Sequence, residues 1–378
     1  MPSRRTLISS AIMALGAIGA GFSFLKTKVF AAKHLAAPPP NGNIMIKKKF
    51  ALGFQWPTNE PFLFCVHHLD HFPNGTSSFG VEKGHHVGRD IGQDFNPKDG
   101  FRMYHGNDVP GFPVHPHRGF ETITIVTRGV VDHADSLGAA GRYGSGDVQW
   151  MTAGDGVQHS EMFPLLNQDS GNTLELFQIW LNLPKKSKKV PAHFTMFWSG
   201  EIPRLKLDNS RVDVTLIAGS FADKQALSPP PDSWAADAAN EVSILLIDIA
   251  AGGSVELPAS KNSVGRSLYV FAGSGLDVNS EVIPSMSGVE VDSRSPLKLS
   301  STGGCRLLVM QAKAIGEPIA QRGPFVMNTR DEIVLAFTDY QKTSFGGWPW
   351  PRNDMVHGSD GSRFAKFPDG RIEKPKKV

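Results

Sequence analysis

Two short motifs place histidine and carboxylate side chains in a pattern that suits metal binding. His115 and His117 are two residues apart, and His159 and Glu161 repeat this spacing later in the chain. Because successive side chains of a β-strand point to opposite faces, each pair would share one face of its strand. Two such strands facing each other across a barrel would direct three imidazole nitrogens and one carboxylate oxygen at one ion. This ligand set suits a divalent first-row metal, most naturally iron(II), with one or two positions left for water or substrate.

The alternative to a metal site is that these histidines are ordinary buried residues with satisfied hydrogen bonds. A single histidine in a barrel would usually be explained in that way, but H-x-H and H-x-E pairs in one domain favour a metal. The same strand parity reaches Glu121, provided that no bulge intervenes at Gly119. Histidine and carboxylate ligands also accept manganese, nickel, copper and zinc, so the residues alone leave the identity of the metal open.

The segments that carry these motifs have the pattern of short β-strands. Beyond the first 45 residues, runs of β-branched and aromatic residues are broken by glycine, which is typical of an all-β sandwich or barrel. A lysine-rich stretch, Lys185–Lys189, separates this series from a second one. We therefore predict two β-domains, residues 46–190 with the metal motifs and residues 191–378 without them. A short helix is expected late in the second, where Thr329 and Glu332 form a capping box.

Length and composition agree with this division. The 378 residues give room for two domains that fold without disulfides or structural metal. The chain has 39 Lys and Arg against 36 Asp and Glu, but residues 1–31 contain four of the basic residues and no acidic one. The remainder is close to neutral, which argues against a nucleic-acid partner. Cys65 and Cys305 are too few for a cysteine-rich scaffold and lie in apolar runs, so we predict buried thiols and leave a disulfide between them open.

The amino terminus has the features of an export signal. Paired arginines at positions 4 and 5 precede an apolar run, Leu7–Leu25, and Val29–Ala31 offers small residues where a signal peptidase cleaves. The arrangement resembles a twin-arginine signal peptide, which implies a periplasmic protein. We assign residues 1–31 to this signal and residues 32–45 to a linker. Cleavage would leave no stable membrane insertion, whereas an uncleaved run is long enough to anchor the protein in the membrane.

Longer motifs make the chain recognisable. Several segments, in the expected order, resemble motifs of the pirin family: Gly111–Thr122 (GFPVHPHRGFET), Asp135–Gly138 (DSLG), Gly146–Gly154 (GDVQWMTAG), His159–Met162 (HSEM) and Gly323–Thr329 (GPFVMNT). The likeness covers roughly Ile46–Trp350 and is strongest in the first half. It implies two cupin barrels (double-stranded β-helix or jelly-roll folds) packed face to face, with one iron in the amino-terminal barrel.

The resemblance also implies roles for individual residues. Carried over position by position, the metal ligands would be His115, His117, His159 and Glu161. Glu121 occupies the carboxylate position of the general cupin motif, and the resemblance makes it a near neighbour of the metal rather than a ligand.

Some pirins are quercetin 2,3-dioxygenases, so the resemblance implies that a flavonol or other small phenolic substrate and dioxygen meet at the metal, in a protein expected to be a monomer. Metal binding would lower the pKa of the substrate's hydroxyl, and Glu161 or Glu121 would take its proton. Other family members are redox-responsive partners of transcription factors. A non-catalytic metal-binding module is therefore the alternative, although export would keep this chain away from such partners.

The sequence departs from shorter pirins in its export signal and in an insertion around Gly75–Phe101, which we expect to cover the mouth of the barrel. In the second barrel, the counterparts of His115, His117 and Glu121 are Ala259, Lys261 and Gly265. No histidine lies between His193 and His357, so this barrel is expected to lack a metal site and to serve a structural role.

The remaining candidates are weaker. His67, His68 and His71 are poorly placed to share an ion, because adjacent residues of a strand point to opposite faces. His105 is predicted to lie in a loop or beside a ligand, and His133 at the surface. A further group is a candidate for lining the pocket, with core packing the alternative for the tryptophans: Gln149, Trp150, Met151, Gln178 and Trp180.

Overall fold

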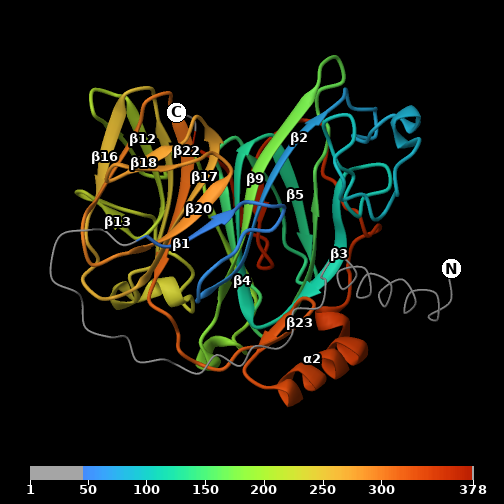
Figure 1. Ribbon diagram of the computed structural model, residues 1–378. Helices are drawn as coiled ribbons and strands as arrows, with labels where there is room; N and C mark the ends of the chain where they lie inside the picture. The colour runs from blue at the N-terminus through green and yellow to red at the C-terminus, as the bar shows by residue number, and fades with distance from the viewer. Residues whose placement is uncertain (1–45, 377–378) are drawn as a thin grey trace.

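The computed structural model describes residues 46–376, and nearly all regular structure in this range is β-strand. The predicted all-β architecture of two barrels with one helix late in the chain is confirmed (Figure 1). The predicted signal peptide and linker lie outside the described residues. Within residues 46–376, no helix is long and apolar enough to cross a membrane.

The first barrel is built from a five-stranded and a six-stranded sheet. The five-stranded sheet has the order β10-β7-β4-β9-β2, and the six-stranded sheet has the order β26-β25-β6-β5-β8-β3. Their bounds are β2 (Phe62–Phe72), β3 (Gly111–His117), β4 (Phe120–Arg128), β5 (Val130–Asp135), β6 (Ala140–Gly144), β7 (Val148–Thr152), β8 (Val157–Met162), β9 (Asn172–Asn182), β10 (His193–Phe197), β25 (Phe364–Lys366) and β26 (Ile372–Glu373). Strand β2 forms one edge of the five-stranded sheet, and β3 forms one edge of the six-stranded sheet.

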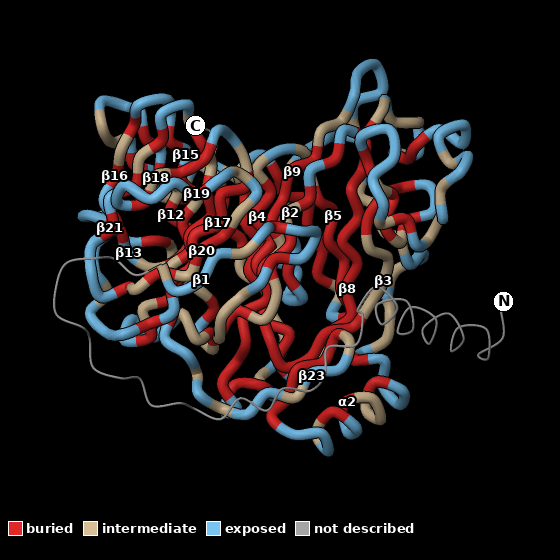
Figure 2. The backbone as a smooth tube through the Cα atoms, in the orientation of Figure 1, coloured by how far each residue is buried: buried red, intermediate tan, exposed pale blue. Residues whose placement is uncertain are grey.

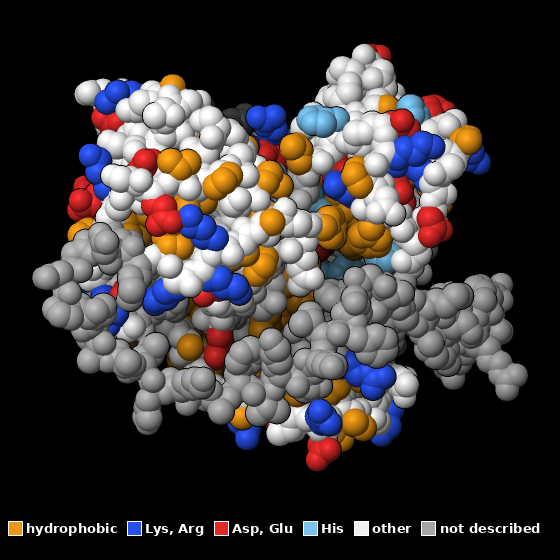
Figure 3. Space-filling view, viewed as in Figure 1, with side chains coloured by type: hydrophobic (Ala, Val, Ile, Leu, Met, Phe, Trp, Pro, Cys, Tyr) orange, Lys and Arg blue, Asp and Glu red, His pale blue; other side chains and the backbone are white. Residues whose placement is uncertain are grey.

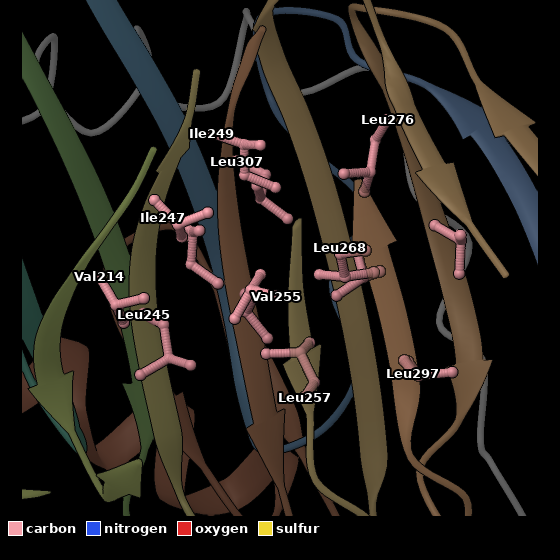
Figure 4. Close-up of a cluster of buried hydrophobic side chains, with 14 of the residues drawn as sticks. Val214, Leu245, Ile247, Ile249, Val255, Leu257, Leu268, Leu276, Leu297 and Leu307 are labelled. Atoms are coloured by element: carbon pink, nitrogen blue, oxygen red, sulfur yellow. The ribbon is translucent and has the colours of Figure 1, made fainter. Parts of the chain in front are cut away.

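The second barrel pairs a seven-stranded sheet, β1-β20-β17-β22-β15-β12-β11, with a four-stranded sheet, β16-β21-β18-β19. Their bounds are β1 (Ile46–Ala51), β11 (Arg204–Leu207), β12 (Val212–Ala218), β15 (Ser243–Ile249), β16 (Gly253–Leu257), β17 (Gly265–Gly273), β18 (Leu276–Val278), β19 (Glu281–Ile283), β20 (Ser287–Asp292), β21 (Leu297–Ser301) and β22 (Cys305–Ala312). Two short ribbons complete the strands: β13 (Ser220–Phe221) with β14 (Lys224–Gln225), and β23 (Ala320–Arg322) with β24 (Phe325–Met327). Figure 4 shows the interior of this barrel filled with aliphatic side chains such as Leu245, Leu268 and Leu307.

The five-stranded sheet of the first barrel packs against the seven-stranded sheet of the second. Alternate residues of β4, β7 and β9 meet those of β15, β17 and β22 in one buried cluster, in which Trp150 and Phe177 lie with Tyr269 and Phe271. In Figure 2 the buried backbone runs without a break from one barrel into the other. This apolar layer explains why the two halves form a face-to-face pair, since separating them would expose it to water.

The strands do not follow the predicted boundary at residue 190. Strand β1 joins the second barrel through pairing with β20, while β10 joins the first through pairing with β7. Strands β25 and β26 come after the whole second barrel in the chain, yet β25 pairs with β6 of the first. Each barrel is therefore completed by strands from beyond its own stretch of sequence.

The one α-helix of the described range, α2 (Arg330–Thr343), confirms the predicted capping box. Thr329 accepts from the backbone N–H of Glu332, and the Glu332 carboxylate accepts from the backbone N–H of Thr329. The buried face of α2 presents Ile333, Ala336 and Tyr340. Short 3-10 turns occur at Lys83–His86, Lys185–Ser187, Trp234–Ala236, Ala238–Asn240 and Ser344–Gly346.

The predicted insertion lies in the connection between edge strands β2 and β3. Arg89 organises it, because its guanidinium donates to the Asp94 carboxylate and to the backbone carbonyls of Lys98 and Phe101. The same guanidinium lies 3.8 Å from the centre of the Phe101 ring. The segment is thus an ordered part of the barrel rim.

Candidate metal centre

The two metal-binding motifs lie on neighbouring strands of one sheet. Strands β3 and β8 are antiparallel partners, and His115 is directly opposite His159. The prediction that the two strands face each other across the barrel is therefore wrong. Side chains directly opposite in an antiparallel pair have Cβ atoms about 5 Å apart, so cross-strand pairing alone brings the imidazoles together.

The three histidines form a compact group. The centres of the His115 and His159 rings are 4.5 Å apart, and each lies 4.8 Å from the His117 ring. One nitrogen from each ring lies within 4.8 Å of the other two. His159 is fully buried and His117 is 3% exposed, whereas His115 is half-buried. The group therefore sits inside the barrel wall and meets the outside through His115.

The ring nitrogens have the arrangement expected for a metal site. His115 donates from Nδ1 to the carbonyl of Pro113 at 2.9 Å, which leaves Nε2 with a free lone pair. Both nitrogens of His159 and Nδ1 of His117 are buried without a hydrogen-bond partner. Since buried polar atoms are nearly always paired, these orphaned nitrogens fit a bound cation.

Burial also keeps these rings in the form that binds metal. It lowers the pKa of His115 to about 4, and it lowers the pKa of His117 and of His159 well below the usual value, with the neighbouring imidazoles adding to the effect. All three rings are therefore neutral at neutral pH, as ligation requires.

Glu161 lies beside this group rather than within it. One of its carboxylate oxygens is 3.9 Å from Nε2 of His159. The carboxylate accepts from the Thr124 hydroxyl at 3.1 Å and from the Gln178 amide at 3.0 Å. Burial raises its pKa, and these hydrogen bonds oppose that effect. The arrangement holds an acidic oxygen next to the three imidazoles, where the sequence predicted a fourth ligand.

Glu121 lies away from the three histidines. A turn with Gly119 at φ +85° separates β3 from β4, so strand parity does not carry over from His117. Glu121 faces the second barrel: it accepts from the Thr152 hydroxyl of the neighbouring strand β7 at 2.7 Å and from the Ser233 hydroxyl, beyond the first barrel, at 2.5 Å. This geometry corrects the expectation that Glu121 is a near neighbour of the metal.

His133 was predicted to be a surface residue, and this prediction is wrong. It is fully buried on β5, where it pairs with Glu161 across the strands, and its ring centre is 5.5 Å from that of His159. Its Nε2 contacts the Asp135 carboxylate at 3.2 Å. His133 and Asp135 repeat the two-residue spacing of the metal motifs, which is the sequence signal that could have revealed them.

Aromatic rings surround the three histidines. The Trp180 ring centre lies 5.5 Å from that of His117, and Phe120 stacks obliquely against Trp180 at 4.4 Å. On the side of the insertion, Phe112 lies 6.3 Å from His115, and His105 lies 5.8 Å from Phe112. In Figure 3, histidine side chains show beside a group of hydrophobic side chains in this part of the molecule. The surroundings suit a flat aromatic ligand.

Of the other residues predicted to line the pocket, Gln178 lies at the site, where its amide donates to the Glu161 carboxylate. Trp150 instead belongs to the core between the barrels. Met151 packs in the core of the first barrel, and Gln149 accepts from the Tyr143 hydroxyl. Thr124 was not predicted to be a site residue, although its alternation along β4 with Phe120 and Thr122 places its side chain on the inner face of the sheet.

The C-terminal part of the chain supports the site from outside the barrel. Gln158, next to His159, donates to the carbonyls of Ser344 and Gly347 and accepts from the Tyr340 hydroxyl. The backbone N–H of Val114, next to His115, donates to the carbonyl of Asn353. Gln158 and Val114, which neighbour two candidate ligands, are thus held by hydrogen bonds to residues that follow the second barrel in the sequence.

The remaining histidines and the cysteines have other surroundings. His67 contacts Glu175, while His68 contacts Tyr104 on the other side of the strand. Cys65 and Cys305 are both free and buried, as predicted for buried thiols, and burial raises the pKa of each.

The second barrel has no counterpart of the histidine group in the described range. Ala259 and Lys261 lie in the connection between β16 and β17, and Gly265 begins β17. The barrel interior is apolar throughout its main cluster, as Figure 4 shows.

Comparison with known proteins finds matches to two family models along the chain. Residues 80–181 match the family described as Pirin, and residues 244–346 match the Pirin C-terminal cupin domain. A Pseudomonas aeruginosa protein provisionally named as a quercetin 2,3-dioxygenase is 39% identical over 240 residues, which span 62% of this chain and 79% of that protein. A pirin-like protein of Caulobacter vibrioides is 35% identical over 237 residues, spanning 62% of this chain and 80% of that protein.

A solved structure confirms the fold. The crystal structure of a quercetin 2,3-dioxygenase from Acinetobacter baumannii superposes with a TM-score of 0.65 and covers 80% of this chain and 99% of that one. The two sequences are 24% identical, so this likeness establishes the architecture and leaves the activity to the site.

Proposed function

The chain belongs to the pirin family, and from that premise we propose that it is a metal-dependent dioxygenase acting on flavonol-type or other phenolic substrates. The observation that carries the proposal is the group of buried, unpaired imidazole nitrogens beside the Glu161 carboxylate. Relatives provisionally named as quercetin 2,3-dioxygenases support the substrate class. The aromatic walls around His115 and His117 support it independently.

We assign the metal to His115, His117 and His159, with Glu161 as the fourth ligand. Iron(II) is the proposed metal, because three imidazoles and a carboxylate suit a first-row ion that keeps one or two positions open. When bound, it would supply Lewis acidity toward the substrate's hydroxyl and electrons for dioxygen.

The chain's own residues would orient the substrate and take its proton. The Glu161 carboxylate, held by Thr124 and Gln178, is positioned to accept the proton of a hydroxyl bound next to His159. Trp180 and Phe112 would pack against the flat rings of the substrate and keep water away from the reacting atoms.

Oxygen uptake after anaerobic loading with iron(II) tests this proposal, with a panel of flavonols and catechols as substrates. We expect uptake with the wild-type protein and its loss in His117→Ala and Glu161→Ala. His71→Ala serves as the matched control, since His71 is exposed on β2. No uptake with any phenolic compound at full iron occupancy would overturn the enzyme assignment and favour the non-catalytic metal-binding module.

We also propose that the protein is exported to the periplasm, on the basis of the paired arginines and apolar run at its amino terminus. Replacing both Arg4 and Arg5 by lysine should leave the protein in the cytoplasmic fraction. Unchanged export of this variant would contradict the twin-arginine assignment.

A further inference from the structure

A second chain of buried polar groups lies inside the first barrel, one aromatic ring away from the metal centre. It consists of Asp70 and His68 on β2 and of Tyr104 from the connection between β2 and β3. All three residues are buried. The Tyr104 hydroxyl donates to the Asp70 carboxylate at 2.5 Å and contacts Nδ1 of His68 at 2.6 Å.

The hydrogen bonds of this chain determine which nitrogen of His68 carries the proton. A tyrosine hydroxyl has one proton, and that of Tyr104 is used on Asp70, whose other oxygen accepts from the Arg102 guanidinium at 3.1 Å. The Tyr104 oxygen must therefore accept from His68, which places the imidazole proton on Nδ1. Burial lowers the pKa of His68 to about 3, so the ring is neutral. Its Nε2 is left as a bare hydrogen-bond acceptor.

This acceptor and the metal centre share one aromatic neighbour. Aromatic rings surround His68: the Phe112 ring centre lies 6.0 Å away, and those of Phe54 and Phe163 lie at 5.6 Å and 6.5 Å. Phe112 is also the ring that lies 6.3 Å from His115. Among residues 46–376 the His68 ring makes its hydrogen bond through Nδ1, and Nε2 is not one of the solvent-excluded nitrogens without a partner, so this nitrogen is open to a hydroxyl from outside.

Two of these rings reach solvent. Phe54 is 42% exposed, and Phe112 is half-buried. Phe112 packs at the edge of the barrel core, so a flat ligand that reached from the three histidines toward His68 would lie along this ring.

We propose that Nε2 of His68 binds a hydroxyl at the end of the substrate that is distal to the metal. The natural substrate class is then a flavonol whose pendant phenyl ring carries hydroxyls, rather than an unsubstituted one. This inference rests on the proposed function and adds a specificity residue to it. Tyr104 is a positioning residue, because it acts on the substrate only through His68.

Equilibrium binding to the zinc-loaded protein without oxygen tests the assignment, because zinc has no redox chemistry and leaves the flavonol intact. The probes are quercetin and galangin, which lacks both hydroxyls of quercetin's pendant ring. One additional hydrogen bond predicts about tenfold tighter binding of quercetin by the wild-type protein. His68→Phe and Tyr104→Phe should bring the two affinities together while zinc stoichiometry stays unchanged.

The matched control is Tyr269→Phe, which removes a buried hydroxyl that donates to the Pro57 carbonyl in the core between the barrels. This variant should keep the preference for quercetin, so a general loss of stability would not imitate the expected result. Equal binding of the two flavonols by the wild-type protein, or a preference that survives in His68→Phe, would overturn the role of His68 and leave the proposed function standing. Binding of neither flavonol would overturn the flavonol proposal itself, and this inference with it.

Discussion

His159 is the residue with most to gain from a bound metal, because both of its ring nitrogens are buried without a partner. Metal that binds only the folded protein stabilises it by about 2.7 kcal/mol at a free concentration one hundred times its Kd. We expect thermal melting to show this stabilisation for the wild-type protein and its absence in His159→Ala. His71→Ala should behave as wild type. A metal-dependent rise in Tm that survives in His159→Ala would contradict the assignment of this ligand.

A second residue-scale prediction concerns the buried ion pair of Arg142 and Asp132 in the first barrel. Nε and Nη2 of Arg142 each donate to Asp132 at 2.7 Å, and the pair is closed off by hydrogen bonds from Arg142 to the carbonyls of His357 and Gly358. Removing one partner of a buried pair leaves the other charge uncompensated, so Arg142→Leu should lower the free energy of unfolding by about 3–5 kcal/mol in urea denaturation.

The control for this prediction is Arg294→Leu, because the Arg294 and Asp292 side chains are partly exposed and belong to the other barrel. A pair in contact with solvent is worth at most about 1 kcal/mol. Equal losses in the two variants would show that burial does not govern the effect.

At the scale of single elements, strand alternation was sufficient to bring His115 and His117 to one face of β3, and His159 and Glu161 to one face of β8. Alternation is a local property of an extended backbone, so it can be read from the sequence. Alternation gave a wrong prediction for Glu121, because a new strand starts after the turn at Gly119 and the alternation does not continue across that turn.

The contacts between strands were harder to predict from the sequence. That β3 and β8 are neighbours depends on the order of strands in the sheet, which residue spacing does not specify. His133 was misplaced for the same reason: its burial comes from pairing of β5 with β8 and β6, and from the later chain packed outside that sheet. The helix, by contrast, was predictable because its cap is formed by residues three apart.

At the scale of the whole molecule, the interface between the barrels contains a buried carboxylate that should make stability depend on pH. Burial raises the pKa of Glu121 to about 7 from 4.5, against the hydrogen bonds from Ser233 and Thr152. Between pH 4.5 and about pH 7, Glu121 keeps its proton in the folded protein but has lost it in the unfolded chain. The free energy of unfolding should therefore fall as the pH rises through this window, and the loss should be complete above about pH 7.

Glu121→Gln should remove this pH dependence, because the amide has no proton to lose. Comparing urea denaturation at pH 5 and pH 8, we expect wild type to lose roughly 3 kcal/mol more than the variant. Glu256→Gln, at an exposed position on β16, should follow wild type. Parallel pH dependence in wild type and Glu121→Gln would show that this carboxylate does not titrate in the window.

The exchange of strands between the barrels also has a consequence for synthesis. Strand β25, which extends the sheet that carries the metal motifs, is translated only after every strand of the second barrel. Domains generally fold in order as the ribosome releases them. Here the amino-terminal barrel cannot close its sheet until the ribosome has made the second barrel and the segment beyond it. A nascent chain arrested before residue 364 would therefore present an unpaired edge on β6 to its surroundings.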